Sequence, residues 1–160
     1  MKITLVLLCM LMLAGTAPSF AQDKEEFRGI KWGAPLEDFK DQMTLSKNSP
    51  KWGEDFRYTR KEDDLNFAGV PVRSIEYGFW RDRFNLVIIV YKGESNFNKL
   101  KEFLFKAYGV GERLPLSMEK YVWNDLTHTG IIFEYNNIQD DGNLLLYSRK
   151  LTKPPTVPQK

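Results

Sequence analysis

The residues able to support catalysis or metal binding are few and scattered in this sequence. His128 is the only histidine and Cys9 the only cysteine, so histidine-rich and cysteine-rich metal sites are excluded by count. The sequence contains no Gly-x-Ser-x-Gly, His-Glu-x-x-His or phosphate-loop motif. The isolated Gly109-Val110-Gly111 is typical of a helix end followed by a turn. The sequence therefore predicts no cofactor, no metal and no identifiable catalytic residue.

Aromatic side chains are the best candidates for a binding surface. If Trp80, Tyr91 and Trp123 share the helix-free face of a sheet, they form a platform for a sugar, an apolar ligand or a partner strand. Trp52, in a loop flanked by Gly and Pro, is a fourth candidate. The alternative is that these rings close a second small core beneath residues 44–72, because large aromatic side chains are usually buried.

Segments of helical and of alternating periodicity must position these side chains. Residues 35–43 are predicted to form a short amphipathic helix. A stronger helix is predicted to be capped at its start by Ser95 or Asn96 and to end at Gly109. Phe84 to Tyr91 is apolar on both faces, which indicates the middle strand of a sheet. A short strand or extended entry is predicted at 27–33. Hairpin connections are predicted at 81–83 and 140–142. The other predicted strands are 55–61, 65–67, 70–72, 73–80, 84–91, 120–123, 130–135 and 143–150.

This order predicts an α+β fold, with a mostly antiparallel sheet of about six strands and two helices on one face. Helix and then strands occur twice along the chain. The aromatic strand and apolar strand at 77–91 are similar to those at 121–135. A duplicated α-β-β-β unit would explain this similarity. The alternative is that any two aromatic hairpins look alike.

The first 21 residues predict an export signal. Ile3–Ala14 is an unbroken apolar run, and Ser19-Phe20-Ala21 places small residues where a signal peptidase reads them, so cleavage is expected after Ala21. The alternatives are an uncleaved anchor, for which the run is shorter than the ~20 residues of a spanning helix, and a lipoprotein acylated at Cys9. Cleavage predicts a periplasmic or secreted protein that contains no cysteine and no disulfide.

The chain after the signal is predicted to hold one domain, at 22–152, and a disordered proline-rich tail, at 153–160. The net charge of the sequence is +2 at pH 7, which argues against a nucleic-acid partner. No membrane span is expected after cleavage. Four Trp, seven Tyr and eleven Phe residues supply material for a core without disulfides.

The segment Phe27–Gly33 (FRGIKWG) and the pattern from Tyr121 to Tyr135 resemble small uncharacterised exported proteins of Gram-negative bacteria. Their mature chains open with Gly-Ile-x-Trp-Gly before a short helix, and the resemblance implies a periplasmic protein with no assigned activity. The helix-then-sheet layout is more distantly similar to that of the BamE outer-membrane-assembly lipoproteins and of β-lactamase inhibitor proteins. This chain lacks the lipobox of the former and the cysteines of the latter, so no functional residue is transferred.

The leading functional hypothesis is a non-enzymatic periplasmic binding module for an unknown protein or for a small apolar or sugar ligand. One alternative is a small hydrolase or lyase that uses carboxylates with Tyr or His128, and it predicts two acidic side chains converging in a cleft near an aromatic wall. Another is a structural or assembly accessory protein of the envelope that docks through residues 153–160.

Overall fold

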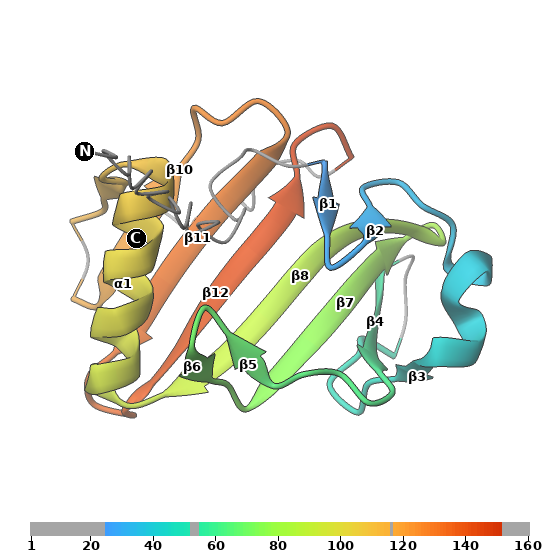
Figure 1. The fold of residues 1–160 in the computed structure, drawn as a ribbon, viewed down its shortest axis with the longest axis horizontal. Helices are drawn as coiled ribbons and strands as arrows, with labels where there is room; N and C mark the ends of the chain where they lie inside the picture. The colour runs from blue at the N-terminus through green and yellow to red at the C-terminus, as the bar shows by residue number, and fades with distance from the viewer. Residues whose placement is uncertain (1–24, 52–54, 116, 152–160) are drawn as a thin grey trace, which may run out of the picture.

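An antiparallel sheet of eight strands forms the frame of the molecule (Figure 1). The computed structural model describes residues 25–51, 55–115 and 117–151. In spatial order the strands are β3 (Met43–Leu45), β4 (Asp55–Arg60), β7 (Ser74–Trp80), β8 (Arg83–Lys92), β12 (Asp141–Ser148), β11 (Thr129–Asn136), β10 (Glu119–Trp123) and β9 (Glu112–Arg113). The other elements are the 3-10 helix η1 (Leu36–Gln42), the α-helix α1 (Glu94–Tyr108) and two small hairpins, β1 (Glu26–Phe27) with β2 (Ile30–Lys31) and β5 (Asn66–Phe67) with β6 (Val70–Pro71).

The predicted α+β fold, with about six strands and two helices on one face, is wrong. The described residues are mostly in strands, the main sheet has eight of them, and α1 is the one α-helix among these residues. The helix predicted at 35–43 is η1, a tight 3-10 helix with no fully buried residue. It contacts the core only through the partly buried Leu36 and Phe39 and is not the amphipathic α-helix that was expected. The α-β-β-β unit is also wrong, because each half of the sheet, β3-β4-β7-β8 and β9-β10-β11-β12, has four strands.

The long strands agree with the sequence-based expectation. The segments predicted at 55–61, 73–80, 84–91, 120–123, 130–135 and 143–150 correspond to β4, β7, β8, β10, β11 and β12. β8 lies between β7 and β12 at the centre of the sheet, as its two apolar faces indicated. Arg81 and Asp82 join β7 to β8 with φ angles of 49° and 58°, the left-handed conformation that a two-residue hairpin turn requires.

The segment 27–33 forms a hairpin instead of one strand. Arg28 and Gly29 turn the chain between β1 and β2 with φ angles of 48° and 82°. The second small hairpin, β5–β6, turns at Ala68 and Gly69, between the strands predicted at 65–67 and 70–72. Both hairpins contribute buried residues to the main core, so they cover the sheet where no helix does.

Helix α1 and the two hairpins lie on the same face of the sheet (Figure 1). Phe97 of α1 stacks on Phe133 and Tyr135 of β11, with ring centroids 5.1 and 4.8 Å apart. The helix ends at Gly109, as predicted, where φ is 79°, but it begins after Gly93, without the side-chain cap expected from Ser95 or Asn96. The core beneath these elements is rich in aromatic rings, and its largest fully buried side chains are Tyr77, Phe79, Phe84, Tyr91 and Phe133.

Two tyrosines of the sheet lie over glycines of a neighbouring strand. Tyr91 is paired with Gly142, and a Cβ atom at Gly142 would stand 2.3 Å from the Tyr91 ring. Tyr147 is paired with Gly130 in the same way, with a corresponding distance of 2.1 Å. Gly142 belongs to β12, because the turn between β11 and β12 lies at 137–140 and not at the predicted 140–142. The glycine is needed for close packing and not for the turn.

No helix within the described ranges is long and apolar enough to cross a membrane. The predicted signal at 1–21 and the predicted tail at 153–160 lie outside the described residues.

Candidate functional site

The structure does not bring the four predicted ligand-binding residues together. Tyr91 and Trp123 are buried, with 0% and 2% of their surface exposed, and both belong to the core on the covered face. Trp80 is partly exposed, and strand alternation directs it to the opposite face. Trp52 lies outside the described residues. An aromatic platform that combines Trp80 with Tyr91 and Trp123 is therefore wrong.

The polar atoms of the two buried rings are used internally. The Tyr91 hydroxyl donates to the backbone oxygen of Glu134 at 2.7 Å, and burial raises the pKa of Tyr91 far above its usual value. The Trp123 indole donates to the backbone oxygen of Gly109 at 2.9 Å, which ties β10 to the end of α1. Both side chains are consequently structural parts of the core.

The opposite face of the sheet carries a second apolar cluster. We call this surface the open face, because α1 and the two hairpins all pack on the other side. Val122, Ile132 and Tyr147 are buried against one another there. Three partly buried leucines pack around them. They are Leu86, Leu114 and Leu145.

A continuous apolar row crosses the open face at right angles to the strands. Val122 pairs with Ile132, Ile132 with Leu145, and Leu145 with Ile88. The row thus takes one residue from each of β10, β11, β12 and β8. An antiparallel sheet that exposes one face to water usually alternates apolar residues inside with polar residues outside. This part of the sheet departs from that pattern.

Polar side chains flank the apolar row, and they are paired with each other. On one side the Lys120 ammonium lies 3.0 Å from Glu134 Oε2, and Glu134 Oε1 accepts from Asn143 Nδ2 at 3.3 Å. At the end of the row, Glu76 is 4% exposed and accepts from Ser46 at 2.7 Å and Asn48 at 2.9 Å. These internal bonds give the open face an apolar centre and a polar border without a large excess of one charge.

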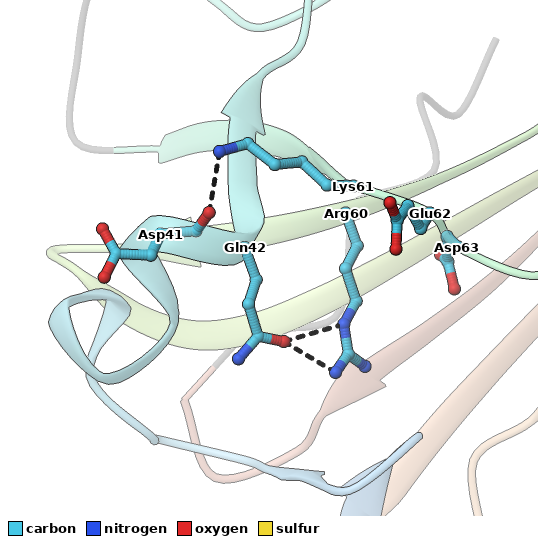
Figure 2. Close-up of a pocket in the computed structure, with 6 residues that line it drawn as sticks. All are labelled: Asp41, Gln42, Arg60, Lys61, Glu62 and Asp63. Atoms are coloured by element: carbon cyan, nitrogen blue, oxygen red, sulfur yellow. Dashed lines mark hydrogen bonds between the residues drawn. The ribbon is translucent and has the colours of Figure 1, made fainter.

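A polar cleft of about 490 Å³ lies at the edge of the sheet, between the end of η1 and the end of β4. Figure 2 shows Arg60 and Gln42 pointing toward each other, with Gln42 Oε1 accepting from Arg60 Nη2 at 2.8 Å. Lys61 donates to the backbone oxygen of Asp41 at 2.7 Å. The cationic groups of this cleft therefore hold η1 against β4.

Next to this cleft, Asp63 joins the β1–β2 hairpin to the sheet. One carboxylate oxygen accepts from Arg28 Nη1 at 2.6 Å and the other from the Tyr77 hydroxyl at 2.8 Å. Burial, followed by the hydrogen bond to Asp63, raises the pKa of Tyr77 well above its usual value. Arg28 also donates to the backbone oxygens of Asp64 and Asn66. We call Arg28, Asp63 and Tyr77 the hairpin anchor.

Other carboxylates that a hydrolase or lyase would need are also held in internal contacts. Glu119 accepts from Arg113 at 2.9 Å and from the Tyr121 hydroxyl at 2.8 Å, and the hydrogen bond from Arg113 lowers the pKa of Glu119. His128 lies 2.9 Å from the carboxylate of Glu25. Within the described part of the chain, no three His, Cys, Asp or Glu side chains form a group that could hold a metal ion.

Comparison of the chain with protein-family models, curated proteins and solved structures gives no match.

Proposed function

We propose that this protein is an exported, non-enzymatic binding module that holds another protein against its open face. The observation that carries the proposal is the apolar row formed by Val122, Ile132, Leu145 and Ile88. Val122 and Ile132 are already buried, but Leu145 and Ile88 are partly exposed on a face that no described helix or hairpin covers. Such side chains gain free energy when a partner removes them from water. A purely structural sheet has no need of such a row, because polar side chains serve equally well on a solvated face.

The shape and charge of the open face favour a protein as the occupant. Four adjacent strands give the row a length of about 14 Å across the sheet, which is wide for a small ligand and suits side chains of a partner protein. Its charges are paired, as between Lys120 and Glu134 and between Arg57 and Glu76, so the face does not attract a polyanion such as a nucleic acid. The expected partner surface is apolar at its centre and polar at its border.

Site-specific photo-crosslinking in cells tests this function. A benzophenone amino acid replaces Ile88, in the centre of the row, and in a matched strain it replaces Ile138. Ile138 is the same residue type, lies in the turn between β11 and β12 and is 91% exposed, so it reports on random encounters. We expect one dominant adduct with a different protein from position 88, and loss of that adduct when Leu145→Glu is added.

Three results would overturn the proposal. They are an absence of adducts at position 88, the same adducts at positions 88 and 138, and an adduct with the mass of two copies of this chain. The last would identify the occupant as a second copy. The variant with Leu145→Glu must keep the circular dichroism spectrum of the parent, and Leu145→Lys serves as a second variant if it does not.

The proposed location is the periplasm or the extracellular space, on the strength of the signal pattern at 1–21. We expect the protein from the cell envelope to have the mass of residues 22–160. Ala21→Arg places a large charged residue at the cleavage position and is expected to leave the full-length mass, whereas Gln22→Glu, one position beyond, is expected to be processed normally. Intact-mass spectrometry of the two variants checks this. A full-length mass for the parent protein would contradict cleavage.

A further inference from the structure

A cavity of about 240 Å³ lies between the β1–β2 hairpin and the ends of β11 and β12, on the covered side of the sheet. β1 runs close to the end of β12 in Figure 1. The cavity is separate from the apolar row, which lies on the opposite face. Its lining combines an aromatic wall with a cluster of polar groups, and the residues that matter are Lys31, Trp32, His128, Ser148 and Lys150.

The aromatic wall of this cavity is fixed in position. The Trp32 ring stacks on Phe84, with centroids 4.8 Å apart and an angle of 21° between the planes. Its indole nitrogen donates to Thr129 Oγ1 at 3.0 Å. A ring held by stacking and by a hydrogen bond presents a preformed flat apolar surface, which lowers the entropy lost when a ligand binds.

The cavity also contains a hydroxyl group. Ser148 lines it and, taken over the whole residue, is only 2% exposed. A serine hydroxyl both donates and accepts hydrogen bonds. A ligand acceptor atom placed beside Ser148 would receive a hydrogen bond in a site largely shielded from water.

The ammonium groups of two lysines determine which ligand charge the cavity favours. Lys31 and Lys150 both line it. The one acidic side chain in the lining, Glu25, is already engaged by His128 Nδ1 at 2.9 Å. The positive groups therefore exceed the negative ones, and the acceptor that Ser148 can satisfy is expected to be anionic.

We propose that this cavity binds a small carboxylate with a planar apolar body. The carboxylate accepts from the Ser148 hydroxyl and lies near the ammonium groups of Lys31 and Lys150. The planar body rests against Trp32. This site is independent of the partner protein proposed for the open face.

Benzoate and its neutral analogue benzamide test this site. Titration of each into the isotopically labelled protein is followed by NMR through the indole signal of Trp32. We expect benzoate to shift this signal saturably and to bind at least about tenfold more tightly than benzamide, which carries no negative charge to pair with the two ammonium groups. Acetate, which lacks the planar body, is expected to bind more weakly than benzoate.

Variants locate the binding within the cavity. Ser148→Ala and Lys150→Met are each expected to weaken benzoate binding by about tenfold, whereas Lys92→Met, at the far end of β8, leaves it unchanged. Lys150 is exposed, so its variant remains informative if Ser148→Ala disturbs folding. Equal affinity for benzoate and benzamide, no shift at millimolar benzoate, or equal loss in the Lys92 and Lys150 variants would overturn the proposal.

Discussion

Tyr91→Ala is expected to lower the free energy of unfolding by about 4 kcal/mol, as is usual when a large aromatic side chain is removed from a core. Tyr91 is fully buried and packs on the rings of Phe133 and Tyr135, at centroid distances of 5.7 and 6.5 Å. Its ring also fills the space above Gly142. No neighbouring side chain replaces the lost volume there, so a cavity remains.

Urea denaturation of two further variants shows where this loss originates. Tyr91→Phe keeps the ring and removes the bond to the Glu134 backbone oxygen, and is expected to cost about 1 kcal/mol. Trp80→Ala removes a partly exposed ring on the opposite face and is expected to cost clearly less than Tyr91→Ala. If Trp80→Ala were the more damaging change, the division of aromatic residues between core and surface would be incorrect.

Asp63→Asn is expected to lower the free energy of unfolding by about 3 kcal/mol, because it leaves the Arg28 guanidinium without its carboxylate and weakens the bond to Tyr77. The side chains of Asp63 and Arg28 are 9% and 21% exposed, so water replaces the lost interactions only in part. The β1–β2 hairpin is expected to lose its protection from hydrogen exchange before the sheet does.

Substitution of a second aspartate, Asp41, is the control that distinguishes loss of the hairpin anchor from the general effect of removing one negative charge. Asp41 is exposed, and the contact of Lys61 with it involves the backbone oxygen and not the carboxylate. Asp41→Asn is therefore expected to change stability by less than about 0.5 kcal/mol. Comparable urea midpoints for Asp41→Asn and Asp63→Asn would contradict the stabilising role of the hairpin anchor.

The long elements of the fold were predictable because their periodicity is local. The apolar stripe of α1 and the double-sided β8 each result from side chains within one segment. The edge strands β3 and β9 were missed because they have three and two residues, too few to show an alternating pattern. Their strand conformation depends on pairing with β4 and β10.

The role of Gly142 was not predictable for a different reason. Asp140-Asp141-Gly142 has the composition of a turn, and the sequence does not show that Tyr91, on a distant strand, occupies the space beside the glycine. Tyr91 and Gly142 come into contact only when β8 and β12 pair in the folded protein.

The residues of the candidate site were not predicted from the sequence. Tyr91 and Trp123 lie on the covered face, whereas strand alternation directs Trp80 to the open face. The apolar row was visible in part, as the two-sided apolar pattern of β8, and was interpreted only as the mark of a middle strand. Its extension over β10, β11 and β12 follows from the register between strands. The resemblance to exported proteins of Gram-negative bacteria stays a prediction.

The most direct test of the open face uses the partner captured at position 88. Its affinity is measured for the parent protein, for Ile88→Glu and for Ile138→Glu, the same substitution at an exposed turn. A charge placed in the centre of the apolar row is expected to weaken binding by about thirtyfold or more, the loss typical of a central interface residue. The Ile138 variant is expected to bind like the parent. Equal affinities of the two variants for the partner would contradict the account.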